Sequence, residues 1–267
     1  MALAEFTRFS LVHEDNIEFK EFGLRDNVAQ FCVLKMNESQ NHIDDIENLK
    51  AQPSRNILIG NIHVLFNPSR GDIKLGQVRL FLDRAHRLSQ TWGNIPVILG
   101  GDLNSMPQSA LYQFVASSEL NIKHHGRKNI SGQICPLDHP SSHSQSSYSS
   151  RPLLHNWSKG ELRLATGTEE SIYLRHNLKL NSAYRGVPAS RLTRDIHGEP
   201  LATSFHSRFL GTVDYIWHTD DLVPVKVLET LPTEDLEKTR GLPSKVWGSD
   251  HLALVCELAF ADDCCGT

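Results

Sequence analysis

The sequence predicts a single layered α/β domain, and three observations support this fold class. The chain has 267 residues, enough to bury a sizeable core in one large domain or two small ones. Hydrophobic residues make up 39% and charged residues 22%, a globular composition rather than a disordered or fibrous one. Between residues 56 and 115, short apolar runs alternate with segments of helical periodicity, as in proteins that pack helices on a sheet.

The N-terminal part of the sequence is predicted to form strands. Residues 6–36 alternate apolar and polar positions, and the polar run at residues 14–16 is the expected turn between two strands. Residues 56–66 (NILIGNIHVLF) are rich in β-branched side chains and predict a stronger strand.

Two helices and another strand should follow. After a turn at residues 67–71, Asp72 is the expected N-cap of a helix whose apolar side chains recur at helical spacing. Residues 95–99 (IPVIL) predict a short buried strand that ends in two glycines. The second helix is expected to start at Pro107, because proline is favoured at the first helical position.

The regular pattern stops near residue 124 and returns near residue 213. Residues 141–150 include seven serines, which makes this stretch too polar to pack in a core. We therefore expect a surface insertion at about 124–170, mobile at its centre. The remaining strands are predicted at residues 213–217, 222–228 and 251–258.

Charge, cysteine content and hydropathy exclude several classes of protein. The formal net charge is −4, so a site for a polyanion must be local rather than spread over a basic surface. No apolar run approaches the roughly 20 residues that span a bilayer, and the first residues lack the layout of a signal peptide. Five cysteines without a CxxC pair argue against a disulfide scaffold or a zinc ribbon. We expect a cytoplasmic or nuclear protein that does not contact membranes.

Four short strings place a polar or ionisable side chain at or beside the end of an apolar strand. They are residues 61–63 (NIH), 101–104 (GDLN), 213–215 (VDY) and 249–251 (SDH). Strand ends present catalytic groups on rigid supports, so these strings are the candidate site.

Asp102 and Asn104 form the most informative pair. They lie two residues apart, so in extended backbone their side chains point the same way. A carboxylate beside a carboxamide offers a proton acceptor or metal ligand next to a neutral donor, which suits the activation of water against a phosphate. The alternative is an Asx-turn that caps the following helix.

The other candidates are two histidines and an acid. Asp214 in a short apolar strand needs a partner, and His251 is the expected one because a carboxylate fixes the tautomer of an imidazole. Asp250 is then available to a cation. The alternatives are a strand-start turn at residues 249–251 and a hydrogen-bonded core residue for His63.

The joint order of these strings over residues 56–260 resembles the endonuclease/exonuclease/phosphatase superfamily, a two-sheet α/β sandwich of metal-dependent phosphoesterases. More narrowly, the chain is similar to the carbon catabolite repressor type of poly(A) deadenylase. The residues that carry this similarity are His63 followed by Asn67 and Pro68, residues 97–105 (VILGGDLNS), and Phe209 upstream of Asp214.

The resemblance implies roles for these residues. Asp102 would prepare the attacking water, Asn104 would hold the phosphate or a metal-bound water, and His63 would donate to a phosphate oxygen. The Asp214–His251 dyad would stabilise charge on the phosphorane. Two Mg²⁺ ions are implied, with ligands drawn from Asp102, Asn104, Asp250 and His251.

The resemblance also implies a substrate. Pro68 and Phe209 match positions that pack against an adenine, so we expect RNA, and poly(A) in particular, as the partner. A scaffold of a deadenylase complex is a further expected partner. Two alternatives remain: hydrolysis of a small phosphorylated nucleotide or inositol-like molecule, and a non-catalytic competitor of a longer paralogue. Phe209 is equally compatible with an ordinary core position.

The chain departs from the family pattern near its N-terminus. The pattern there has a strand ending in asparagine, a helix, and a strand with a metal-binding glutamate in a Gln-Glu-Val-like string. Glu5, Glu14, Glu18 and Glu21 precede His63, but none of these four follows an apolar strand in that context. We therefore expect a homologue that lacks the N-terminal part of the catalytic domain, with unpaired strand edges and weakened activity.

Overall fold

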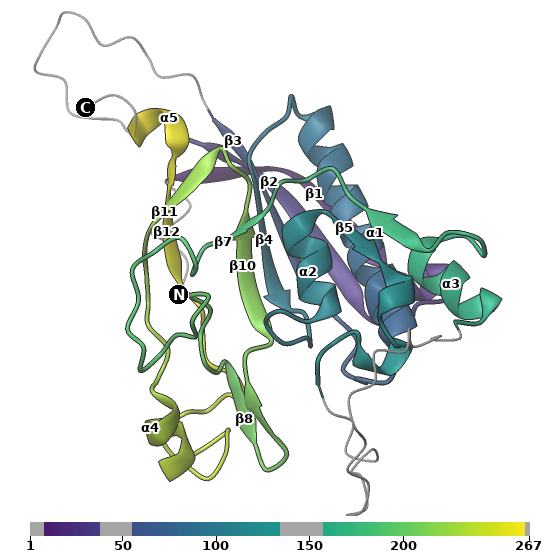
Figure 1. Ribbon diagram of the computed structural model, residues 1–267. Helices are drawn as coiled ribbons and strands as arrows, with labels where there is room; N and C mark the ends of the chain where they lie inside the picture. The colour runs from purple at the N-terminus through teal and green to yellow at the C-terminus, as the bar shows by residue number, and fades with distance from the viewer. Residues whose placement is uncertain (1–7, 38–54, 134–156, 265–267) are drawn as a thin grey trace, which may run out of the picture.

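A six-stranded mixed sheet forms the centre of the computed structural model, which describes residues 8–37, 55–133 and 157–264 (Figure 1). Neighbouring strands are antiparallel except β3 and β4, which are parallel and therefore end at the same edge. The spatial order of the strands is β1 (Phe9–Glu18), β2 (Val28–Met36), β3 (Asn56–His63), β4 (Val97–Asp102), β10 (Asp214–His218) and β7 (Asn181–Ser182).

Three helices cover one face of this sheet: α1 (Gly71–Thr91), α2 (Ala110–Ser117) and α3 (Lys159–Thr166) (Figure 1). Alternate strand residues point toward the helices, so Leu58 and Leu99 are almost fully buried in the shared core. The apolar stripe of α1 packs on them, and the ring of Phe81 stacks on Phe31 with centroids 5.1 Å apart. This face contains most of the hydrophobic core.

The helix α3 packs closely against α1. A side chain at Gly76 of α1 would place its Cβ only 2.3 Å from the carbonyl oxygen of Leu164, so the contact depends on a glycine. Ser158 and Glu161 form a capping box that fixes the start of α3. The margins of the insertion expected at 124–170 are therefore ordered and partly packed in the core, while residues 141–150 lie outside the described residues.

A second, smaller sheet lies on the opposite side of the central sheet (Figure 1). It consists of β11 (Leu222–Val227) and β12 (Cys256–Phe260), which pair antiparallel. Arg55 before β3 joins the two layers: its guanidinium lies 4.4 Å from the Phe260 ring centroid and pairs with Asp263 at 2.9 Å. The two-sheet α/β sandwich is confirmed, although the second sheet has only two strands among the described residues.

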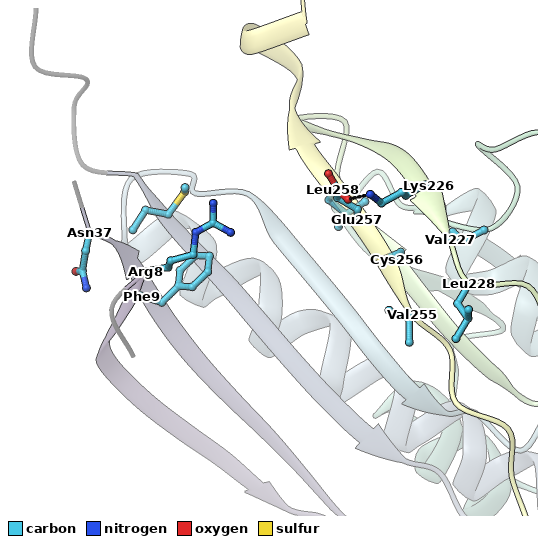
Figure 2. A pocket seen from close by; sticks show the side chains of 11 residues that line it. Arg8, Phe9, Asn37, Lys226, Val227, Leu228, Val255, Cys256, Glu257 and Leu258 are labelled. Atoms are coloured by element: carbon cyan, nitrogen blue, oxygen red, sulfur yellow. Dashed lines mark ion pairs between the residues drawn. The ribbon is translucent and has the colours of Figure 1, made fainter. Parts of the chain in front are cut away.

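The strands β11 and β12 cover only a small part of the central sheet, so the sheet face that is turned toward them is partly open. Leu11, Val12 and Val28 on the outer strands are 50%, 40% and 49% exposed. A cavity of about 850 Å³ separates Phe9 from Val255 and β12, as Figure 2 shows. An adjoining cavity of about 720 Å³ is lined by isoleucines of β3, β4 and β10. This apolar face has room for further β-structure.

The remaining elements are short. Two antiparallel strand pairs, a pair of helices and three 3₁₀ helices complete the described chain: β5 (Glu119–Asn121) with β6 (Tyr173–Arg175), the hairpin of β8 (Ser204–His206) and β9 (Phe209–Gly211), α4 (Thr233–Lys238), α5 (Ala261–Cys264), η1 (Phe19–Phe22), η2 (Ile122–His124) and η3 (Arg127–Asn129). None of the helices in these ranges combines the length and the apolar character needed to cross a membrane.

The turn predicted at residues 14–16 is wrong, because β1 continues through it. Arg84 of α1 donates to both carboxylate oxygens of Asp15, at 2.8 and 2.6 Å, so the acid is paired inside the strand. The chain reverses after η1 instead, where Gly23 adopts a φ of 71°.

Three predicted boundaries also shift. Arg70, not Asp72, is the N-cap of α1, and Asp72 lies buried in the first turn with its carboxylate bonded to Arg70. The helix α2 begins at Ala110, because the hydroxyl of Ser109 caps it by accepting from the Tyr112 amide. The last strand begins at Cys256 rather than at residue 251.

Candidate active site

Three adjacent strands bring His63, Asp102 and Asp214 into register at one edge of the sheet. His63 pairs with Asp102 across β3 and β4, and Asp214 pairs with Asp102 across β10 and β4. Residues paired in register point to the same face, so the three side chains lie together. Gly101 makes this approach possible: its φ is 132°, and a Cβ there would lie 2.0 Å from the Ile62 carbonyl oxygen.

His251 completes the cluster from a distant part of the chain. The loop before β12 is held against β8, where His251 forms a bridge with Ser204 and the Leu252 amide donates to the Thr203 carbonyl. The Nδ1 atom of His251 lies 2.8 Å from Oδ2 of Asp214. Potential ligand atoms of Asp102, Asp214 and His251 all lie within 4.8 Å of one another. The expected convergence and the expected dyad are both present.

Within the cluster, the pKa values of Asp102 and His251 are both shifted from their ordinary values. Burial raises the pKa of Asp102 to about 6, and the neighbouring Asp214 carboxylate adds to this increase. The hydrogen bond to Asp214 raises the pKa of His251 to about 9, against the effect of partial burial. At neutral pH, therefore, Asp102 is mostly an anion and His251 is an imidazolium.

Asn104 holds Asp102 in place. Its backbone amide donates to Oδ1 of Asp102 at 2.6 Å, and its side-chain amide donates to Oδ2 at 3.0 Å and to the Val64 carbonyl at 2.9 Å. Asn104 is 4% exposed and has a φ of 45°, a left-handed conformation that asparagine tolerates. The Asx-turn considered from sequence exists, but Ser109 caps the following helix, so this turn serves Asp102.

His63 is not a core residue. Its side chain is 69% exposed, and its Nε2 lies 3.5 Å from Oδ2 of Asp102. The side chain of Asn27 donates to the His63 carbonyl at 2.9 Å and so fixes the end of β3. His63 can therefore turn its ring toward a ligand bound at Asp102 while its backbone stays in place.

The other predicted site residues lie outside this cluster. Asp250 is exposed and is not one of the clustered acids, although its backbone carbonyl accepts a hydrogen bond from Ser204. Pro68 lies in the turn after β3. Phe209 begins β9, where its ring lies 5.9 Å from that of His206.

Lys74 of α1 is a part of the site that sequence reasoning missed. Its side chain is fully buried, and its Nζ donates to the Asn104 carbonyl at 2.7 Å. Burial lowers the pKa of Lys74 to about 7, although the nearby Asp102 carboxylate opposes this change. Its position between Ile73 and Leu75 did not indicate that the side chain is buried, because lysine is common on exposed helix faces.

The cluster fits a divalent cation in part. Asp102 and Asp214 place two carboxylates together, and the Asp214 carboxylate raises the cost of ionising Asp102, a cost that a cation would lower. Mg²⁺ takes one or two carboxylates and keeps several waters, which matches this donor set. His251 matches less well than expected, because an imidazolium has no free lone pair for a metal. Asp102 and Asp214 are the residues that would hold the ion.

Asp102→Asn should stabilise the folded protein at neutral pH by about 1 kcal/mol. The folded-state pKa of Asp102 is raised, so ionisation destabilises the fold above pH about 6 and has no effect below pH about 4. The expected gain in stability is smaller than the full pKa shift would give, because asparagine at this position loses the hydrogen bond that the Asn104 side chain donates to the Asp102 carboxylate.

Urea unfolding at pH 7 and pH 4.5 tests this expectation. The stability of the variant relative to the parent should be higher at pH 7 than at pH 4.5, because most of the cost of ionising Asp102 disappears as the pH falls from about 6 toward 4. Asp15→Asn is the control, because Asp15 is paired with Arg84 and its replacement should not stabilise the protein. A variant that is less stable than the parent at pH 7 would contradict the charge argument.

Comparison with known proteins agrees with this geometry. The family model of the endonuclease/exonuclease/phosphatase family matches residues 7–251. The chain is 57% identical over 261 residues to carbon catabolite repressor protein 4 homolog 5 of Arabidopsis thaliana, covering 96% of this chain and 57% of that protein. Homolog 3 of the same plant is 51% identical over 259 residues, covering 96% and 55%. The chain thus spans little more than half the length of these relatives.

A solved structure supports the same assignment. The crystal structure of ANGEL2, a 2′,3′-cyclic phosphatase, in complex with adenosine-2′,3′-vanadate, superposes with a TM-score of 0.67 at 29% identity. The match covers 94% of this chain and 68% of that chain. Members of this family hydrolyse phosphoester bonds and generally depend on divalent metals. With its family match, its sandwich fold and its acidic cluster at the strand ends, the chain belongs to the endonuclease/exonuclease/phosphatase family.

Proposed function

We propose that this chain carries the phosphate site of a Mg²⁺-dependent phosphodiesterase that removes adenylates from the 3′ end of RNA, in particular from poly(A) tails. The observation that carries this proposal is the register of three strand ends, which sets Asp102 beside the Asp214–His251 dyad. The names of the plant relatives support the deadenylase type.

Asp102 acts as the acceptor in the proposed reaction. Its carboxylate, whose pKa is about 6 when no cation is bound, is ionised at neutral pH and can accept a proton from an attacking water. Asn104 holds both oxygens of this carboxylate, so the acceptor does not have to be ordered during the reaction. A bound divalent cation would supply water activation and neutralise phosphate charge.

The two histidines act as donors. The imidazolium of His251, held by Asp214, donates from Nε2 to a phosphate oxygen and stabilises the charge that accumulates there. His63 donates to a second oxygen from the opposite side of Asp102, which its exposed ring can reach. The protein thereby offers hydrogen-bond donors on both sides of the reacting phosphate.

Recognition of adenine is assigned to Pro68 and Phe209, on the basis of the family resemblance. Stacking needs no basic groove and is compatible with a net charge of −4. Pro68 is anchored near His63 by the turn that follows β3, and Phe209 belongs to the β8–β9 hairpin that also holds the His251 loop. Both therefore come from elements that bound the cluster.

A second candidate is hydrolysis of a 2′,3′-cyclic phosphate at an RNA end. The similarity to ANGEL2, which was crystallised with adenosine-2′,3′-vanadate, favours it. The chemistry at the phosphate would use the same donors and the same acceptor. The two functions differ only in whether the chain is shortened.

A single assay separates these functions. The purified chain is incubated with Mg²⁺ and 5′-labelled oligo(A) that ends either in a 3′-hydroxyl or in a 2′,3′-cyclic phosphate. A ladder of shorter products from the 3′-hydroxyl substrate supports deadenylation, whereas loss of the cyclic phosphate without shortening supports the second candidate. Asp102→Ala should abolish either activity. If both substrates stay intact, the non-catalytic reading is favoured for this chain.

A further inference from the structure

A cavity beside the phosphate site has no role in the reaction described above. It has a volume of about 580 Å³ and lies between the loop that precedes β2 and the turn that follows β3. His63 lines this cavity and also faces Asp102, with its Nε2 3.5 Å from Oδ2. The cavity is therefore continuous with the phosphate site through one shared side chain.

The walls of the cavity are held rigidly by Gln77 of α1. This fully buried side chain donates to the Leu24 carbonyl at 2.7 Å and to Oδ1 of Asn27 at 3.1 Å, and it accepts from the Leu65 amide at 2.8 Å. One amide thus ties the β2 loop to the turn after β3. Asn27 strengthens the tie by donating to the His63 carbonyl. A preformed cavity binds a ligand without paying for its own ordering.

Two arginines supply donors. Arg25 is exposed, and in the part of the chain that the structure describes its side chain makes no ion pair or hydrogen bond. Its φ is 74°, an unfavourable value for a residue with a side chain. Arg70 is fixed by two bonds to Asp72, at 3.0 and 2.7 Å, which involve Nε and Nη2. Asp26 is the one carboxylate that lines the cavity.

The remaining wall is apolar. Val28 is 49% exposed and Leu65 is half-buried, so both offer an aliphatic surface to the cavity. A ligand that satisfies this site needs an anion for the arginine forks and a flat apolar group for the aliphatic wall. A nucleotide unit has both features.

We propose that this cavity is a subsite for the nucleotide joined to the one whose phosphate lies at the Asp102 cluster. Arg25 contacts its phosphodiester group, and Val28 and Leu65 pack against its base. The inference rests on the proposed function and sharpens it, because a mononucleotide would leave the cavity empty. The site would thus favour a polynucleotide over a small phosphorylated molecule.

Binding measured without catalysis tests the subsite. Fluorescence anisotropy in EDTA compares dye-labelled oligo(A) with unlabelled AMP as a competitor, for the parent and for Arg25→Gln. The variant should bind oligo(A) about tenfold more weakly and AMP equally well, since one charge-assisted contact is lost. The slope of log affinity against log salt should fall by about 0.7 for oligo(A). Arg240→Gln is the matched control, because Arg240 is also exposed at a positive φ of 64° but lies outside the cavity.

Each outcome decides the proposal. Unchanged oligo(A) binding by Arg25→Gln, an equal loss for AMP, or no binding by the parent would overturn the subsite. If the parent shortens oligo(A) while Arg25→Gln binds it normally, the subsite fails and the proposed function stands. If the selective loss occurs but the parent does not hydrolyse oligo(A), the subsite stands and the catalytic proposal fails.

Discussion

His251→Ala should lower the rate of phosphodiester hydrolysis by about 10³-fold at saturating substrate. The imidazolium is the charged donor nearest the pair of carboxylates, and its loss removes a charge-assisted bond that strengthens in the transition state. The effect should lie mainly in kcat rather than in KM, because the same bond is weaker in the ground state. His197→Ala, which replaces an exposed histidine outside the cluster, should leave the rate unchanged.

The pH dependence gives a separate test of the dyad. In the parent, activity should fall as pH rises through about 9, where His251 loses its proton. Asp214→Asn removes the carboxylate that raises this pKa, so the alkaline limit should move toward about 6.5, the ordinary value for histidine. The measurement is kcat against pH in whichever form of the protein, this chain or a longer one, shortens 5′-labelled oligo(A). An alkaline limit that does not move would refute the dyad.

Much of this site follows from local sequence, for a physical reason. Asp102 and Asp214 are acids at the ends of short apolar strands, and such acids need partners when a sheet buries them. His251 was identified as a partner because few other side chains stabilise a carboxylate of this kind. The register of β4 and β10 places Asp102 and Asp214 together, and the bridge between His251 and Ser204 brings the histidine to them.

What sequence reasoning missed depends on contacts between distant residues. The strand β1 runs through residues 14–16 because Arg84, far along the chain, neutralises Asp15. Lys74 is buried because the Asn104 carbonyl accepts from it, and no pattern within α1 indicates that contact. The cavity that contains Arg25 exists because Gln77 joins two loops that local propensity treats separately. Local propensity depends on residues that are close in sequence, whereas these contacts join residues that are far apart in sequence.

The open face of the central sheet leads to the other large expected effect. Leu11 of β1 is 50% exposed, and isoleucines of β3, β4 and β10 line a cavity beside β12, which with β11 forms a sheet of two strands among the described residues. The plant relatives are much longer than the part that matches this chain. The family pattern includes a strand with a metal-binding glutamate, and we expect that a segment of this kind would cover the face and complete the cation site.

A chimera that carries a segment with the family's strand and glutamate string ahead of residue 8 should be more stable and far more active than the 267-residue chain. Burial of several apolar side chains contributes about 1.5–3 kcal/mol each at full burial, so the free energy of unfolding should rise by several kcal/mol. A further carboxylate should tighten Mg²⁺ binding and raise the rate of oligo(A) shortening by about 10²-fold or more, because metal activation lowers the barrier by several kcal/mol. Urea unfolding, Mg²⁺ titration and the labelled oligo(A) assay measure these three effects, and a chimera in which the added glutamate is replaced by glutamine separates the metal effect from the packing effect. The glutamine chimera should keep the added stability and lose the added rate. Equal rates for the 267-residue chain and the chimera would show that acids already present in this chain complete the cation site.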